Sequence, residues 1–276
     1  MKPGCHPLPF LLLYSSKDPA GVNIAEKLRD LFDFEEVSEN LWKHSKLPIF
    51  LTCTDKELIY LDGFNPPMKD VELLVFLSRH SSETGIPCLT VHVSGNPSSQ
   101  ALYGGRPKEL AVAHPTFMSS ALIYLDETRN SLSLNYQVSL EATHHGPSLI
   151  SIPSFFIEIG SSIQQWKDFK AGEAIALSVM KTLEKPFDLP HSLGFGGGHY
   201  PPKITRYVLE RRGAVGHIFP KYILAEGFDR EVVFQAISKT VGGYSRVVLD
   251  WKGVPGSVRP AIVSFAEEQG LELIEL

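Results

Sequence analysis

The chain has 276 residues, of which 43% are hydrophobic and 21% charged, and its formal net charge is −5 at pH 7. This composition is typical of a soluble globular protein with one large domain or two packed ones, and no apolar run reaches the ~18 residues that a membrane helix needs. The negative charge argues against broad, sequence-blind binding to nucleic acids, although cations gather between His199 and Tyr222.

The cysteine pattern points to a reducing compartment. Cys5, Cys53 and Cys88 are far apart and form no CxxC pair, so neither a disulfide framework nor a thiolate zinc site is expected. We therefore expect a cytoplasmic protein. An apolar run at residues 8–14, with no small-residue cleavage site after it, favours a buried first strand over a signal peptide.

Along the chain, apolar runs of strand length alternate with segments of helical periodicity. The predicted strands cover residues 9–14, 57–61, 71–78, 88–93, 136–141, 155–159, 215–219, 246–249 and 271–275. The predicted helices cover residues 20–32, 115–125, 171–183, 204–211, 230–241 and 260–269. This alternation predicts an α/β fold whose mixed, largely parallel sheet is flanked by helices. We expect a single domain over 1–276, and the polar stretch 126–133 allows two packed subdomains of about 1–130 and 131–276.

Polar side chains collect at the ends of the predicted strands, where open α/β sheets bind their ligands. Arg79 and His80 follow the strand at 71–78, and His92 lies near the end of the next one. Glu141 and the pair His144-His145 follow the strand at 136–141. Two further candidates are Glu158, at the end of its strand, and His199, within a glycine-rich loop.

Imidazoles and carboxylates are a donor set that suits zinc, and a catalytic zinc needs three protein ligands and an open position. The candidate ligands are His92, His144, His145, Glu158 and His199. The chain has no HExxH sequence. Lone histidines are more often structural, and this is the interpretation for His6, His44, His114, His191 and His217.

Glu141 and Glu158 are candidate bases, because a carboxylate beside a metal-bound water can take its proton; a salt bridge is the alternative for each. Arg79, Lys203 and Lys221 could hold phosphate, or could be solvated surface cations. There is no Walker A or GxSxG sequence. The glycines at 194–198 lack the spacing of a dinucleotide-binding fingerprint, and they are expected to follow a loop rather than a buried strand.

The glycine-rich loop contains Gly196, Gly197 and Gly198, followed by His199, Tyr200, two prolines and Lys203. Glycines allow the backbone to approach a ligand closely, and the prolines stiffen the end of the loop. Such a loop can present groups to a substrate, or it can be an ordinary surface turn.

Taken in order, these motifs resemble the archaeal and plant type of D-aminoacyl-tRNA deacylase. The resemblance rests on the segments Glu141 to Pro147, Glu158 to Ser162 with Trp166 behind it, and Gly196 to Lys203. It is supported by the segments beginning at Ser78, His92 and Gly216, and it covers essentially the whole chain.

The resemblance implies hydrolysis of the ester that joins a D-amino acid to the terminal adenosine of tRNA. It also implies dependence on zinc, with one or two ions per chain, and a fold similar to peptidyl-tRNA hydrolases and zinc peptidases. The family's histidine-rich motifs place metal ligands at His144, His145 and His199.

The residues are compatible with that activity. An aminoacyl ester is activated, so a positioned water suffices without a covalent intermediate. The N–H groups of the glycine loop could stabilise an oxyanion, Tyr200 could stack on the terminal adenine, and the basic strip with Lys203 and Lys221 could contact tRNA. No membrane partner is expected, and a monomer is favoured. The alternatives are a zinc peptidase or amidohydrolase, and a non-enzymatic RNA-binding module.

Overall fold

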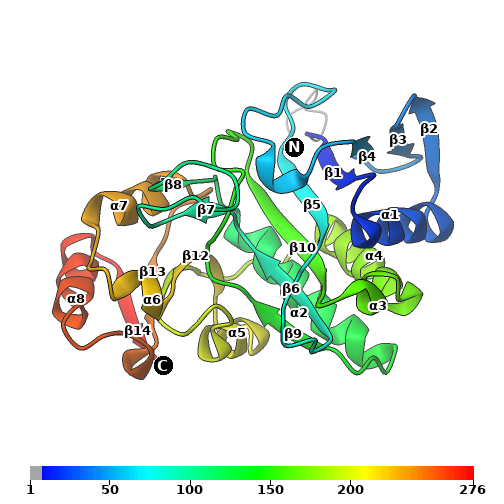
Figure 1. Ribbon diagram of the computed structural model, residues 1–276. Coiled ribbons are helices and arrows are strands. Elements are labelled where there is room, and N and C mark those ends of the chain that lie inside the picture. The colour runs from blue at the N-terminus through cyan, green and yellow to red at the C-terminus, as the bar shows by residue number, and fades with distance from the viewer. Residues whose placement is uncertain (1–7) are drawn as a thin grey trace.

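The computed structural model describes residues 8–276, so Cys5 and His6 lie outside the described part. The strands form a large sheet, a smaller sheet and a two-stranded hairpin (Figure 1). The large sheet has the strand order β2-β3-β4-β1-β5-β10-β6-β9. Its strands are β1 (Phe10–Ser15), β2 (Phe34–Ser38), β3 (Leu41–His44), β4 (Ile49–Thr54), β5 (Leu73–Arg79), β6 (Cys88–His92), β9 (Gln137–Leu140) and β10 (Ser154–Gly160).

The centre of the large sheet is parallel. The strands β4, β1, β5 and β10 run in one direction, whereas β6 and β9 run in the other. The central strands β5 and β10 are near-continuous buried apolar runs, as is typical of strands covered on both faces. The predicted α/β class, with a mixed and largely parallel sheet flanked by helices, is confirmed.

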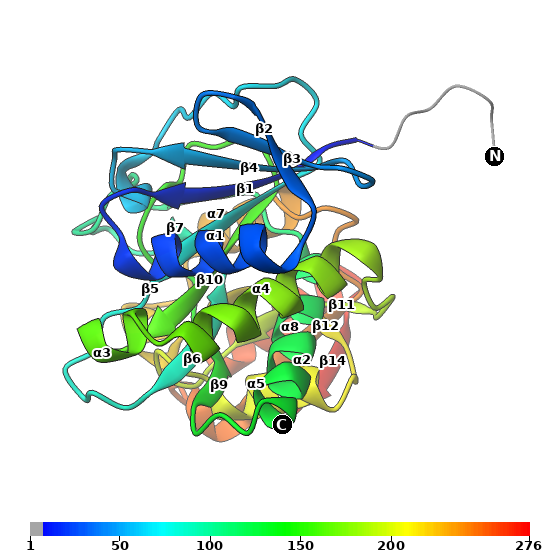
Figure 2. The same cartoon turned by 90° about the vertical axis from the view of Figure 1, so that its right-hand side faces the viewer.

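Helices cover one face of the large sheet. They are α1 (Pro19–Leu31), α2 (Pro115–Ser131) and α4 (Phe169–Glu184), with the short α3 (Ile163–Trp166) before α4. Figure 2 shows α1, α4 and α2 in front of the sheet, and α4 packs against both of the others. A buried stripe at every fourth residue of α4 explains this packing, and it comprises Ala171, Ile175, Val179 and Leu183.

The N-terminus of α1 is tied to the end of β5 by one buried carboxylate. Asp18 accepts a hydrogen bond from the N–H of Ala20 at 2.9 Å, which caps the helix. Its other oxygen accepts from the N–H of Arg79 at 2.8 Å. This link holds in place the strand end from which His80 emerges.

The opposite face of the large sheet changes from apolar to polar along its length. Phe76 and Phe156 stack with their ring centroids 4.4 Å apart, and they belong to an apolar cluster that also contains Leu11 and Leu13. The imidazole of His92 then stacks on Phe156, with the centroids 5.2 Å apart. The polar part of this face is where the candidate site lies.

The smaller sheet has the order β12-β11-β13-β14, and all its strands are parallel. It comprises β11 (His191–Phe195), β12 (Ala214–Phe219), β13 (Arg246–Leu249) and β14 (Glu272–Glu275), and its helices are α5 (Pro202–Leu209), α6 (Lys221–Leu224), α7 (Arg230–Ser238) and α8 (Arg259–Glu268). The hairpin consists of β7 (Gly95–Asn96) and β8 (Glu109–Leu110), and the 3-10 turns are η1 (Leu58–Tyr60) and η2 (Trp251–Gly253). Because α2 packs against β12, the two sheets share an apolar core.

The strand predicted at residues 57–61 is wrong, because this segment forms the 3-10 turn η1. Leu58 and Leu61 are both buried in the cluster around Phe76. Their spacing of three residues is the repeat of a 3-10 helix, and so short an apolar run does not distinguish a turn from a strand.

The glycine loop does follow a buried strand, contrary to the prediction. β11 pairs on both sides, with β12 and β13, and is buried over most of its length. Its small residues Ser192 and Gly194 have low strand propensity, so tertiary pairing rather than local preference forms this strand.

The stretch 126–133 does not separate two sheets. Its first residues are the last turns of α2, where Arg129 pairs with Asp126 on the surface. Strands β9 and β10, which follow it, belong to the same sheet as β1. A division into subdomains stays a prediction, and the sheets would place it after β10. Among residues 8–276, no helix has the length and apolar character needed to cross a membrane.

Candidate active site

Titratable side chains from distant parts of the chain meet on the polar face of the large sheet. β5 is followed by His80, β6 ends with His92, and Glu158 lies two residues before the end of β10. In the ladder between β6 and β10, His92 is opposite Phe156 and Thr90 is opposite Glu158. Since alternate residues of a strand share a face, His92 and Glu158 project to the same side.

The remaining site residues come from the segment after β9 and from the glycine loop. The N–H of Ala142 donates to the carbonyl of His199 at 2.8 Å, and the N–H of Thr143 donates to the carbonyl of Ile218 at 3.1 Å. These bonds place the segment with Glu141, His144 and His145 between the two sheets. Because β6 and β9 run against β5 and β10, the site spans the sheet face rather than one carboxyl edge.

Glu141 is the centre of the cluster. Its carboxylate is fully buried and accepts a hydrogen bond from Nε2 of His199 at 2.6 Å. Nδ1 of His80 lies 3.2 Å from its other oxygen, and Nε2 of His144 lies 3.6 Å away. Desolvation alone would raise the pKa of Glu141, but the hydrogen bonds from His199 and His80 hold it well below its usual value. Glu141 is therefore an ionised anchor for His199 and His80, and His144 lies beside it.

His80 bridges the two buried carboxylates. Its Nδ1 also lies 3.6 Å from Glu158, and its Nε2 is bonded to the hydroxyl of Tyr200. Burial opposes protonation, but the bonds to Glu141 and Glu158 raise the pKa of His80 to about 12. Desolvation raises the pKa of Glu158 to about 7. One acid is thus held ionised and the other is poised near neutrality, which is typical of acid–base pairs in active sites.

A second group of imidazoles adjoins Glu141. Nε2 of His92 and Nε2 of His145 are 3.1 Å apart, and the rings of His92 and His144 have their centroids 4.3 Å apart. Burial lowers the pKa of all three, to about 4 for His145 and well below the usual value for His92 and His144. His145 also has a φ of 46°, a left-handed conformation that costs a residue other than glycine energy and is most frequent at functional sites.

This second group has the donor chemistry of a metal site. Nδ1 of His144 is 2.7 Å from the carbonyl of Ala142, and Nδ1 of His145 is 2.5 Å from that of Gly146. These carbonyls require a proton on Nδ1, so each Nε2 offers a lone pair, the arrangement found in metal-binding histidines. Ligand atoms of His92, His144 and His145 lie within 4.8 Å of one another. Neutral imidazoles that converge in this way fit a bound cation.

The cations expected to contact phosphate are engaged elsewhere or lie outside the cluster. Arg79 pairs with Glu57 at 3.0 Å, and Lys203 pairs with Asp250 at 2.8 Å while also donating to the carbonyl of Leu276. Lys221 is exposed at the start of α6. The basic strip is therefore partly neutralised by its own acidic neighbours.

The glycine loop supports the site mainly through its backbone conformation. The N–H groups of Gly196 and Gly197 donate to the carbonyls of Phe219 and Gly253 at 2.8 and 3.2 Å, so these two donors are not directed at a ligand. Gly197 has a φ of 78°, and a Cβ there would lie 2.8 Å from Pro201. A Cβ on Gly198 would meet nothing within 4 Å.

The histidines interpreted as structural lie in other places. Nδ1 of His44 accepts from the N–H groups of Lys46 and Leu47. His191 is bonded to Thr116 at 2.8 Å, and His217 is fully buried on β12. His114 precedes α2.

The sequence reasoning missed the support beneath His145. The N–H of Gly146 donates to the carbonyl of Tyr103 at 2.9 Å, and Gly104 and Gly105 both have positive φ. A Cβ on Gly146 would lie 2.3 Å from the backbone nitrogen of Gly105, so two glycine segments interlock here. In the sequence, the adjacent glycines at 104 and 105 were the feature that indicated a close backbone contact.

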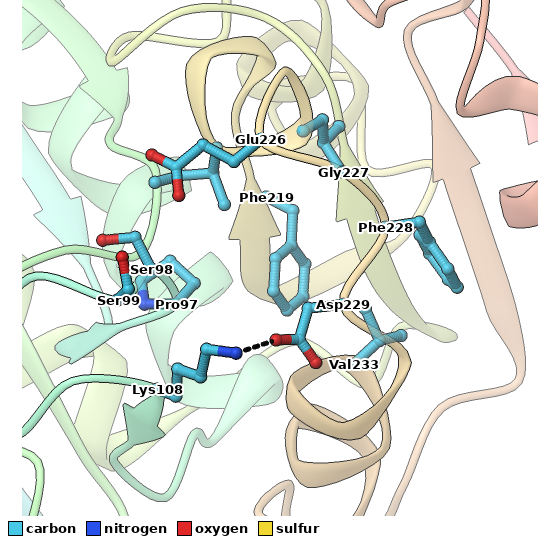
Figure 3. A pocket seen from close by; sticks show the side chains of 12 residues that line it. Pro97, Ser98, Ser99, Lys108, Phe219, Glu226, Gly227, Phe228, Asp229 and Val233 are labelled. Atoms are coloured by element: carbon cyan, nitrogen blue, oxygen red, sulfur yellow. Dashed lines mark ion pairs between the residues drawn. The ribbon is translucent and has the colours of Figure 1, made fainter.

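Two cavities lie near these elements. One of about 780 Å³ opens beside Tyr200. The other, of about 340 Å³, lies between the segment at 97–99 and the start of α7, and Phe219 lies at its base. Figure 3 shows the ion pair of Lys108 with Asp229, two residues of its lining, and their charged atoms are 2.8 Å apart. Its lining contains none of the cluster residues.

A family model and relatives found by sequence agree on one family. A family model described as D-aminoacyl-tRNA deacylase matches residues 67–274. A protein of that name from Pyrococcus furiosus is 39% identical, over 96% of this chain and 99% of its own length, and one from Thermococcus kodakarensis is 39% identical over 96% and 98%. The crystal structure of a conserved protein of unknown function, AF0625, superposes with a TM-score of 0.89 at 32% identity, covering 98% of this chain and 96% of that one.

Proposed function

The chain belongs to the D-aminoacyl-tRNA deacylase family, and on that premise we propose that the cluster around Glu141 hydrolyses the ester between a D-amino acid and tRNA. The observation that carries this proposal is the convergence of neutral imidazoles, an ionised carboxylate and a carboxyl group with a pKa of about 7. This set can activate a water and needs no covalent nucleophile.

We assign a zinc ion to the group of His92, His144 and His145. One ring nitrogen of each lies within 4.8 Å of the others, and Nε2 of His92 is 3.1 Å from Nε2 of His145. The carbonyls behind His144 and His145 select the tautomer that leaves Nε2 free. When bound, zinc lowers the pKa of a coordinated water towards ~7 and polarises a carbonyl oxygen. His199, the further ligand candidate, directs its Nε2 at Glu141. Together with His80 they form a second group whose ligand atoms lie within 4.8 Å of one another.

Glu158 is the proposed general base. Its pKa of about 7 lets it accept a proton from water at neutral pH and release it in a later step. The water oxygen bonds to the ester carbon, the bond to the ribose oxygen breaks, and that oxygen takes up the proton. The products are the free D-amino acid and tRNA with its terminal hydroxyl restored. Glu141 stays ionised and positions His80 and His199.

The first experiment measures release of D-tyrosine and L-tyrosine from their tRNA esters by the full chain. We expect the D-ester to be hydrolysed much faster. Equal and slow loss of both esters would contradict the proposal, and hydrolysis of small peptides with the esters untouched would favour a peptidase instead.

The second experiment tests the metal ligands with a matched pair of substitutions. His144→Asn removes Nε2 of that histidine from the cluster. His44→Asn makes the same substitution away from the cluster, at a histidine whose Nδ1 accepts hydrogen bonds from Lys46 and Leu47. We expect the first variant to lose more activity than the ~10–100-fold cost of an outer-shell partner, together with its zinc by elemental analysis. The second should keep both. Full zinc content and turnover in His144→Asn would refute the ligand assignment.

A further inference from the structure

The cavity of about 780 Å³ adjoins the catalytic cluster through Tyr200. The hydroxyl of Tyr200 is bonded to Nε2 of His80, and its partly exposed ring lines the cavity. Ser161, three residues after Glu158, lines the cavity as well and donates to the carbonyl of Ile86 at 2.6 Å. A molecule in this cavity would therefore have its nearest end beside the reacting groups.

The walls of the cavity have the character of a nucleoside site. They are formed by the segment at 84–88, by β9 at the edge of the large sheet, and by α5. Apolar and aromatic side chains make up much of the surface, as a stacked base requires, and they are Ile86, Pro87, Tyr136, Val138, Tyr200, Pro202 and Leu209. The side chains of Thr84, Asn135 and Gln137 lie between them and can bond to base and ribose edges.

A cation that is largely uncommitted lies at the rim. The Arg206 side chain is 70% exposed, and its pair with Glu210 is long, at 3.8 Å. Arg129, the other cation of the lining, is already paired with Asp126 at the end of α2. Guanidinium groups suit phosphate oxygens, to which they can donate two hydrogen bonds.

The volume of the cavity indicates whether it holds the amino acid or the nucleoside of the aminoacyl ester. About 780 Å³ falls within the range of ~300–1,000 Å³ for sites that hold drug-sized molecules. An amino-acid side chain would leave most of this space empty, and it would not explain a cation at the rim. A nucleoside with a phosphate on its far side accounts for both features.

We propose that this cavity binds the 3′-terminal adenosine of the tRNA substrate, with Arg206 contacting its 5′-phosphate. The inference rests on the proposed function, because the substrate ester joins the ribose of that nucleoside to the carbonyl that must reach the cluster. The edge of β9 and the face of α5 are then the surface on which the enzyme recognises the end of tRNA.

The test uses adenosine 5′-monophosphate as the probe and two matched tryptophan substitutions in the full chain. Gln137→Trp places an indole in the proposed cavity from an exposed position of β9, and Ser99→Trp places one in the cavity of about 340 Å³ from an exposed position. We expect the nucleotide to bind the wild type and to compete with D-tyrosyl-tRNA. Gln137→Trp should weaken binding and raise KM by about tenfold or more, as expected from loss of a stacked base. Ser99→Trp should change neither.

A second pair of variants tests the phosphate contact. Arg206 and Arg212 each lie 3.8 Å from Glu210, but only Arg206 lines the cavity. Arg206→Gln should weaken binding of the monophosphate more than that of adenosine and reduce the salt dependence of KM by about one charge. Arg212→Gln should leave the ratio of the two affinities unchanged.

The outcomes separate this inference from the proposed function. If the wild type deacylates D-tyrosyl-tRNA but binds no nucleotide, or binds it equally well after Gln137→Trp, the adenosine assignment is overturned. D-tyrosinamide, which represents the amino-acid part of the substrate, is the second probe. If Gln137→Trp loses binding of D-tyrosinamide but keeps binding of the nucleotide, the cavity holds the amino acid and the adenosine assignment is overturned. If the wild type binds the nucleotide but does not deacylate D-tyrosyl-tRNA, and Gln137→Trp loses that binding, the adenosine assignment is supported. The catalytic proposal is then refuted.

Discussion

His217 offers a quantitative test of how this fold responds to pH. Its side chain is fully buried on β12, with Nδ1 3.3 Å from the hydroxyl of Thr143. Among residues 8–276, its Nε2 has no hydrogen-bond partner. Burial lowers the pKa of His217 from 6.5 to about 3, because a charged imidazolium would lose its hydration there.

The sign and the size follow from linkage. Between pH 6.5 and 3 the unfolded chain binds a proton at this position and the folded chain does not, so stability is complete above pH 6.5 and falls as the pH falls. Each pH unit costs about 1.4 kcal/mol, and the whole interval from 6.5 to about 3 amounts to about 5 kcal/mol. That is comparable with the total stability of ~5–15 kcal/mol of many domains.

The assay is urea unfolding of the wild type and His217→Asn at several values between pH 5 and 7.5, with a chelator present. Asparagine does not titrate, so the free energy of unfolding should fall less steeply with acid in the variant, by about 1.4 kcal/mol per pH unit below pH 6. The cavity left by the smaller side chain shifts the whole curve by a constant and does not alter its slope. His114→Asn should also flatten the curve, since burial lowers the pKa of His114 to about 4.

Parallel pH profiles for wild type and His217→Asn would refute the reasoning. They would mean that the imidazole is protonated, or remains neutral, equally in both states. A steeper profile in the variant would reverse the sign and would show that the folded state favours the imidazolium.

Three further predictions concern the site. Glu158→Gln should lower kcat by ~10²-fold or more, while its zinc content by elemental analysis should equal that of the wild type. A kcat within threefold of the wild-type kcat would show that Glu158 is not the base. The wild-type kcat/KM should rise with pH through about 7, where Glu158 ionises. If kcat/KM of Glu158→Gln rises over the same pH range, the titration belongs to another group. Gly146→Ala should lower Tm by several degrees, because its Cβ would lie 2.3 and 2.4 Å from backbone atoms of Gly105 and Ile59. Gly198→Ala, with nothing within 4 Å, should leave Tm unchanged, and equal losses in both variants would show that space is not the cause.

Regular elements with a strong period were predictable from the sequence. The stripe on α4 and the apolar runs of β5 and β10 are local patterns, and their burial follows from the period alone. The strand at Arg246–Leu249 has the predicted bounds. The hairpin of β2 and β3 was missed because it lies at the sheet edge and most of its residues are exposed, so its pattern is weak.

The site was predictable only as a set of candidates. The polar residues at strand ends indicated His80, His92 and Glu141 as ligand-grade groups. Their arrangement required contacts over long separations: Tyr200 and His80 are 120 positions apart, and His199 and Glu141 are 58 apart. No local pattern specifies such a pairing.

The sequence by itself determined the α/β class, the family and the kinds of side chain available for chemistry, since these depend on residue type, period and motif. Only the tertiary structure decided which groups meet and in which charge state. In the fold, the N–H groups of Gly196 and Gly197 donate to backbone carbonyls, and Lys203 pairs with Asp250. The pKa of Glu141 is held low, whereas the pKa of Glu158 is about 7. The reason is that a pKa or a free hydrogen-bond donor depends on burial and on neighbours in space, and the chain order carries that information only through the completed fold.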